Sequence, residues 1–192
     1  LYCRIMFDEN TSAELPEHEE WIHSYAIPFL MSEFGLKTKV VQSSESYVDI
    51  FYKQKQKGKH IGEIYGFPYL LGAWCNSRLK MTPIKRYGTE VGEHKMIVGI
   101  ACDEIKRIKK STVLNSILPL VDYKITESMA FKICKPYNLV SPAYNETCTR
   151  LGCWFCHNQK VAELKRLRTM YPNLWCKLLE LDKDSHSSFT PN

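Results

Sequence analysis

The stretch Met96-Ile-Val-Gly-Ile-Ala-Cys102 is the longest apolar run of the chain, and the acidic pair Asp103-Glu104 follows it directly. A short, continuous apolar run that ends at polar residues is typical of a strand buried in a parallel sheet. In open α/β sheets, ligands bind beyond the carboxyl ends of the strands. We therefore expect Asp103 and Glu104 to lie close to a bound ligand.

Strand-like and helix-like segments alternate around this run. Residues 1–7 predict a strand that ends at Asp8, and residues 37–42 predict another. Between them, Pro16 and the acids after it favour a helix that continues to Phe34 and ends at Gly35. Further helices are expected over residues 46–55, 126–137, 159–170 and 173–181, and loops over residues 57–68 and 139–158. This alternation predicts an α/β domain with a mainly parallel sheet.

Length, charge and hydropathy narrow the class of protein. The chain has 192 residues, 44% of them apolar, with 26 Lys and Arg against 21 Asp and Glu, so the net charge is +5. A chain of this length fits one domain, or one domain with a small appendage. Its mild excess of positive charge suits an anionic ligand or a nucleic-acid partner. No apolar run approaches the roughly 18 residues of a membrane span, and no export signal is recognisable, so we expect no membrane partner and a cytoplasmic protein. Because the chain begins with Leu1 inside an apolar run, we expect native residues to precede it.

Three of the eight cysteines gather in Cys148-Thr-Arg-Leu-Gly-Cys153-Trp-Phe-Cys156. The two thiolates of a Cys-x-x-Cys pair can reach one metal from a tight turn. Cys148 is a third candidate ligand and Cys75 a fourth, and four thiolates suit a [4Fe–4S] cluster or structural zinc. Buried free thiols, a redox dithiol and covalent haem at Cys153-x-x-Cys156-His157 are the alternatives.

Basic residues near these cysteines are candidates for binding an anion. A guanidinium group can hold two phosphate or sulfate oxygens at once, whereas an ammonium group acts as a point charge. We predict that Arg78, Lys80 and Arg107 bind an anion and that Arg150, just before the Cys-x-x-Cys pair, takes part. The lysines at 106, 109 and 110 are expected to be ordinary solvated side chains.

Five segments, taken in order, resemble the phosphoadenosine phosphosulfate (PAPS) reductase family of adenine-nucleotide α-hydrolase-like proteins. They are Phe7-Asp8-Glu9-Asn10 followed by Pro16-Glu17, Trp74-Cys75-x-x-x-x-Lys80-x-x-Pro83-Ile84, Gly99-x-x-x-Asp103-Glu104-x-x-Arg107, Leu118-Pro119 to Thr126-Glu127, and Arg150-Leu-Gly152-Cys153-x-x-Cys156. The resemblance extends over nearly the whole chain.

This resemblance implies a five-stranded, mainly parallel sheet with helices on both faces and an adenine nucleotide across the strand ends. Residues 1–138 would form this domain, without its native first strand and phosphate loop, and residues 139–192 a Cys-rich loop with C-terminal helices. Cys75, Cys153 and Cys156 match three cluster ligands of the cluster-bearing reductases. Trp74 stands where the family has a paired Cys, so Cys148 is the fourth candidate. The family's Ser-Gly-Gly-x-Asp-Ser loop and its C-terminal catalytic Cys have no counterpart in this chain.

The function implied is sulfonucleotide reduction, or a related sulfur transfer, with a bound cluster and with ATP, PAPS or adenylyl sulfate as the nucleotide. Arg78, Lys80 and Arg107 would bind the phosphate or sulfate end. The acids Asp8, Asp103 and Glu104 would face the nucleotide or orient these three basic side chains. The alternatives are an adenylating sulfurtransferase that acts on DNA or tRNA, and a non-catalytic binding subunit whose cysteines hold a structural metal ion.

Overall fold

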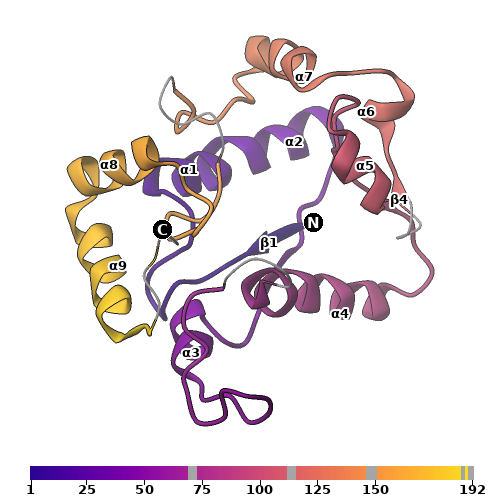
Figure 1. The fold of residues 1–192 in the computed structure, drawn as a ribbon. Coiled ribbons are helices and arrows are strands. Elements are labelled where there is room, and N and C mark those ends of the chain that lie inside the picture. The colour runs from indigo at the N-terminus through magenta and orange to yellow at the C-terminus, as the bar shows by residue number, and fades with distance from the viewer. Residues whose placement is uncertain (69–72, 112–115, 146–150, 187–188, 190–192) are drawn as a thin grey trace. The chain divides into compact units, whose positions relative to one another are not determined.

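The computed structural model describes residues 1–68, 73–111, 116–145, 151–186 and 189 (Figure 1). Internal contacts divide the chain into two units. The first unit comprises residues 1–87 and 142–192, and the second comprises residues 88–141. The sequence predicts a domain boundary after residue 138. The two units do not test whether the segments on either side fold independently, so that boundary stays a prediction.

The predicted five-stranded sheet is wrong. In the first unit, β1 (Tyr2–Arg4) pairs in parallel with β2 (Val40–Gln42), and in the second, β3 (Met96–Ile97) pairs in parallel with β4 (Ser116–Ile117). The described strands form only these two separate pairs. The apolar run at 96–102 extends as a strand over two residues, and the side chain of Ile97 is 70% exposed. An apolar run indicates burial, but a strand in a wide sheet also needs a partner strand on each side, and the run does not specify those partners.

The helix predicted from Pro16 to Phe34 is confirmed, with one irregular turn. It consists of α1 (Pro16–Trp21), a π-helical segment η1 (Ile22–Ala26) and α2 (Ile27–Phe34). Gly35 ends it in the left-handed conformation, with φ 64°. The π-helical segment lies just before Pro28, which has no N–H to donate to the preceding turn.

The other predicted helices are also present, in shorter form. A capping box between Ser46 and Asp49 starts α3 (Tyr47–Tyr52). The predicted helix at 126–137 is α7 (Glu127–Cys134), followed by the 3-10 turn η4 (Lys135–Tyr137). The two C-terminal helices are α8 (Val161–Met170) and α9 (Pro172–Asp184).

Four helical segments were not predicted. They are the π-helical η2 (Cys75–Met81), α4 (Thr82–Val91), α5 (Ile105–Ser111) and α6 (Pro119–Asp122). The first of them carries three of the predicted site residues, Cys75, Arg78 and Lys80, on one element. Among the described residues, we find no helix with both the length and the apolar character needed to cross a membrane.

The core of the first unit is a cluster of aromatic rings. Phe7 lies 4.5 Å from Trp154 and 5.1 Å from Phe155, measured between ring centroids, and Tyr47 lies 4.2 Å from Phe155. Leu79 of η2 belongs to the same buried cluster. The segment between the two cysteines of the Cys-x-x-Cys pair is therefore part of the hydrophobic core.

Candidate thiol and anion site

Trp154 fixes the Cys-x-x-Cys turn to the N-terminal part of the chain. Its side chain is fully buried, and its indole N–H donates to the Ser12 carbonyl at 2.7 Å. Its backbone N–H donates to the Ala13 carbonyl at 2.9 Å, and the Cys156 N–H closes the turn on the Cys153 carbonyl at 2.9 Å. Cys153 and Cys156 thus lie at the two ends of a tight turn, as a chelating pair requires.

Cys75, the first residue of η2, lies beside this turn. It is half-buried and packs against the aromatic core. Burial, with a smaller contribution from the neighbouring Cys156, raises the pKa of the Cys75 thiol to about 11. We call Cys75, Cys153 and Cys156 the thiol cluster. The fourth predicted ligand, Cys148, lies outside the described residues.

Two charged groups face the thiol cluster. Burial raises the pKa of Cys153, and the negative charge of Glu14 adds to the effect, as do Cys156 and Cys75. The ammonium group of Lys80 acts in the opposite direction on Cys153, and it also lowers the pKa values of Glu14 and Cys3. Lys80 therefore supplies the positive charge that acts on the Cys153 thiol and the Glu14 carboxyl.

The protonation of Glu14 follows from its surroundings. Burial raises the pKa of its carboxyl, and Glu19 raises it further against the opposing effect of Lys80. His18 approaches the carboxylate at 3.7 Å. Sequence reasoning missed Glu14, because no motif relates this position to the distant Cys153. The Trp154 hydrogen bonds to residues 12 and 13, and the packing of Phe7 on Trp154, bring the two segments together.

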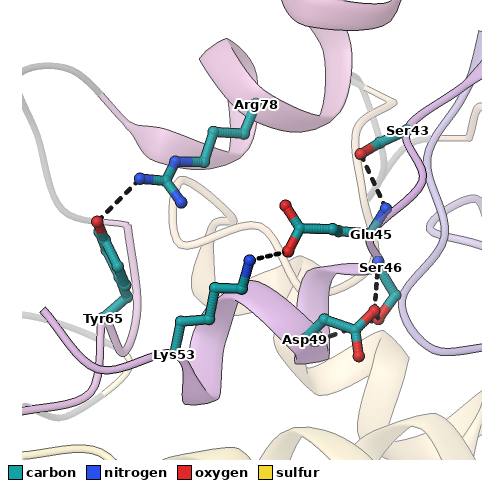
Figure 2. Close-up of polar contacts among 7 residues, drawn as sticks. All are labelled: Ser43, Glu45, Ser46, Asp49, Lys53, Tyr65 and Arg78. Carbon is teal, nitrogen blue, oxygen red and sulfur yellow. Dashed lines mark hydrogen bonds and ion pairs between the residues drawn. The ribbon is translucent and has the colours of Figure 1, made fainter.

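Arg78 extends from η2 toward Tyr65, as Figure 2 shows. Its guanidinium donates to the Tyr65 hydroxyl at 2.8 Å and lies 4.7 Å from the centre of that ring. Within the part of the chain that the structure describes, no carboxylate forms an ion pair with Arg78, whereas Lys53 in the same view is paired with Glu45. Arg78 therefore keeps N–H donors and an unbalanced positive charge that an anion can use.

The predicted ligand-binding residue Asp8 is used within the fold. Its carboxylate accepts the N–H groups of Asn10 at 2.9 Å and Thr11 at 2.7 Å, and it forms an ion pair with Lys177. Burial would raise the pKa of Asp8, but the hydrogen bonds from Lys177 and Asn10 hold it below its ordinary value. This carboxylate closes the turn after β1 and ties it to α9.

The remaining predicted residues lie in the second unit or outside the described ranges. Asp103 accepts the N–H of Glu127 at 3.1 Å, at the start of α7. Glu104 pairs with Arg107 at 2.6 Å and accepts the Ala101 N–H at 3.1 Å. These contacts complete the ends of α5 and α7 within that unit. Arg150 lies outside the described residues.

Among the described residues, no group of three or more His, Cys, Asp or Glu side chains is arranged to hold a metal ion. The structure brings Cys75 and Cys156 to Cys153, on which Lys80 acts, and it places Arg78 on the same helical segment as Lys80. The Asp8 carboxylate is not part of this group, because it is bound to Lys177 and to the N–H groups of Asn10 and Thr11. These findings define the candidate site on which the function is argued.

Comparison with known proteins gives relatives of unassigned activity. No family model matches the chain, and no solved structure matches it. The chain is 31% identical over 87 residues to an uncharacterized nin region protein of Escherichia phage lambda, covering 44% of this chain and 30% of that protein. Two uncharacterized proteins of Methanocaldococcus jannaschii are 26% and 25% identical over 126 and 139 residues. These two matches cover 59% and 66% of this chain, but 26% and 34% of the relatives, so the chain spans about a quarter to a third of their length.

Proposed function

We propose that the protein binds an adenine nucleotide and acts in sulfonucleotide reduction, or a related sulfur transfer, at a thiolate-held iron–sulfur cluster, as a member of the PAPS reductase family. The observation that carries this proposal is the convergence of three cysteines from two distant segments, where the charge of Lys80 acts on the buried Cys153. Three thiols and a cation in one half-buried place suit a centre that holds an anionic sulfur group. In this reading the protein is an oxidoreductase or a sulfurtransferase.

Four thiolates would hold an iron–sulfur cluster, and structural zinc is the alternative. A single tetrahedral zinc ion holds its thiolates about 3.8 Å apart, since each Zn–S bond is roughly 2.3 Å. A four-iron cluster sets its thiolates farther apart, because each binds a different iron. Cys148 would be the fourth ligand, and the bound cluster would supply a redox centre beside the sulfur group.

The residues of η2 would bind the anionic end of the nucleotide. Arg78 would donate to two phosphate or sulfate oxygens, and Lys80 would add a point charge between these oxygens and the thiols. The core residues behind them, Leu79 and Trp74, limit the access of water on one side and so strengthen these interactions. The free state of the described cysteines suits a reducing compartment, and we place the protein in the cytoplasm.

A second candidate function, sulfur transfer to DNA or tRNA, is favoured by the basic surface of α5. Lys106, Arg107 and Lys109 are all exposed on this helix. Phosphate contacts release counterions, so this function predicts binding to tRNA or duplex DNA that weakens steeply as salt rises. Salt-independent binding would rule this candidate out.

Calorimetric binding of PAPS, adenylyl sulfate and ATP tests the proposal. We expect Lys80→Ala and Arg78→Ala to weaken binding of at least one of them by about 10-fold or more, because each removes a charge-assisted contact of roughly 1.5–3 kcal/mol. The matched control is Lys59→Ala, which removes an exposed lysine from the loop before β-bridge residue Ile64. If all three nucleotides bind the variants as they bind the original protein, or if none binds at all, the proposed nucleotide site is wrong.

A further inference from the structure

A lysine-rich hairpin follows α3 in the first unit. Its two arms run antiparallel and meet at the β-bridge between Gln54 and Ile64. At its base, the Tyr65 N–H donates to the Lys53 carbonyl at 2.9 Å. Figure 1 shows this segment extending away from α3. We call residues 53–65 the basic hairpin.

The tip of the basic hairpin presents polar and apolar side chains to solvent. Gly58 and Gly62 turn the chain there, with φ of 91° and 86°, a left-handed conformation that glycine adopts without strain. Between these glycines lie Lys59, His60 and Ile61, all of them exposed. The side chain of Ile61 is 66% exposed, so it adds little to the core of this unit.

The basic hairpin carries a large part of the positive charge of the chain. It contains four lysines and one acid, a net charge of +3, against +5 for all 192 residues. The single acid, Glu63, is itself surrounded by basic groups. Its carboxylate lies 3.0 Å from the His60 ring and 3.6 Å from both the Lys55 ammonium and the His186 ring. The hairpin therefore has no acid left to balance the lysines of its tip.

Two lysines at the tip keep their charge available for a partner. The lysines nearer the base, Lys53 and Lys55, are paired with carboxylates. Across the described ranges, no carboxylate forms an ion pair with Lys57 or Lys59, and both side chains are exposed. Each of these ammonium groups can contact a phosphate of a nucleic-acid backbone and release its counterion.

The base of the hairpin adjoins the candidate anion site on η2. The Trp74 indole N–H donates to the Gly66 carbonyl at 3.2 Å, and the Arg78 guanidinium donates to the Tyr65 hydroxyl at 2.8 Å. Figure 2 shows Arg78 reaching toward Tyr65, with Lys53 close to that ring. A polyanion bound along the hairpin would therefore approach the anion site from its tip.

We propose that the basic hairpin binds duplex DNA and holds it beside η2. The major groove of B-form DNA admits a two-stranded β-ribbon, so the tip can enter it with Lys57 and Lys59 on the flanking phosphates and Ile61 against base edges. A single strand fits less well, because such strands are bound by stacking on aromatic side chains, and residues 57–62 include no Phe, Tyr or Trp. The deep, narrow major groove of RNA helices likewise favours DNA. This inference deepens the second candidate function, sulfur transfer to nucleic acid, and rests on it.

Fluorescence anisotropy of a short labelled DNA duplex, titrated with the full chain at several salt concentrations, tests the proposal. We expect saturable binding that Lys57→Ala combined with Lys59→Ala weakens by about tenfold or more. Each lost phosphate contact removes roughly 0.9 from the slope of log K against log salt, so the double variant should lower that slope by about 2. Lys57→Arg combined with Lys59→Arg keeps both charges and should bind as the original protein does.

The matched control is Lys37→Ala combined with Lys39→Ala, which removes two exposed lysines at the same spacing from the same unit. It should leave duplex binding and its salt slope nearly unchanged. Ile61→Ser should weaken duplex binding without changing the salt slope, because it removes an apolar contact and no charge.

Four outcomes would overturn the proposal. They are an absence of saturable duplex binding, an equal loss in the control pair, tighter binding of tRNA or of a single strand than of the duplex, and association with vesicles of anionic phospholipid in place of DNA. Duplex binding that is lost in Lys106→Ala combined with Lys109→Ala, but kept without Lys57 and Lys59, would assign the DNA to α5 and also overturn it.

Failure of this inference is distinguishable from failure of the nucleotide site. The variants at 57 and 59 leave Arg78 and Lys80 in place, so calorimetry should show nucleotide binding as in the original protein. Nucleotide binding without duplex binding contradicts the hairpin proposal alone. Duplex binding that needs Lys57 and Lys59, in a protein that binds no nucleotide, contradicts the nucleotide site alone.

Discussion

Asp8 shows how a single residue can fit a functional pattern and yet serve the fold. An acid at the end of a strand is where an α/β sheet places ligand contacts, and this reasoning singled it out. In the structure its carboxylate accepts two backbone N–H groups and pairs with Lys177. These partners are enough to account for an acid at this position.

Replacement of Asp8 by Asn should lower the free energy of unfolding at pH 7 by about 1 kcal/mol, since it removes a partly exposed ion pair. The folded-state pKa of Asp8 lies below its ordinary value of 3.8. Its stabilising contribution is therefore complete above that value and is lost as the pH falls through the folded-state pKa. Urea unfolding at pH 7 and at about pH 2.5 measures the difference.

The control for this prediction is Glu9→Gln, which neutralises the exposed neighbouring acid. We expect it to leave stability nearly unchanged at both pH values. A loss in Asp8→Asn that is equally large at low pH would contradict the role given to the ionised carboxylate.

The predictability of site residues depends on how local their partners are. The Cys153–Cys156 pair is visible in the sequence because its chelating geometry needs only one turn, and Cys75 was a candidate because a metal centre suits four thiolates. Glu14 could not be found this way. Its surroundings come from the Trp154 hydrogen bonds and from the packing of Phe7 on Trp154, which no spacing rule encodes.

At the scale of elements, α3 illustrates a helix start that the sequence specifies well. The Ser46 hydroxyl accepts the Asp49 N–H at 3.2 Å, and Asp49 accepts the Ser46 N–H at 2.7 Å. Tyr47, Ile50 and Phe51 then bury the inner face of the helix in the aromatic core. A stable start for α3 thus helps to hold the core that supports the thiol cluster.

Ser46→Ala should lower the free energy of unfolding by about 1 kcal/mol, because it leaves the Asp49 N–H without its cap. Chemical denaturation measures this loss, and the exposed Ser44→Ala is the matched control. In a double-mutant cycle with Asp49→Asn, the two changes should cost less together than the sum of the single losses, since they disrupt one motif. Strict additivity would show that the capping box is not a coupled unit.

Helices with clear start and stop signals were predicted correctly, and η2 with α4 were not. Pro83 is the second residue of α4, close to a helix start, where proline is tolerated. The π-helical pitch of η2 also obscures the usual apolar period. Local patterns therefore predicted most helices, and they failed where a proline is tolerated at a junction.

At the scale of the whole molecule, the predicted wide sheet gives way to two separate strand pairs, one in each unit. Parallel pairing was correctly expected, but which strands join is a long-range property that the sequence pattern does not contain. The first unit is instead organised by its aromatic core, which collects residues 7, 47, 154 and 155. This core positions the Cys-x-x-Cys turn and η2 beside each other, and the central functional claim rests on that arrangement.

Iron, zinc and acid-labile sulfide content, measured with a visible spectrum on anaerobically purified protein, tests this claim most directly. We predict about four irons and four sulfides per chain with a broad band near 400 nm, as a thiolate-held cluster gives. Cys153→Ser should abolish this content, whereas Cys176→Ser, at an exposed cysteine of α9, should retain it. Protein that binds no iron, binds only zinc, or keeps its iron in Cys153→Ser would contradict the account.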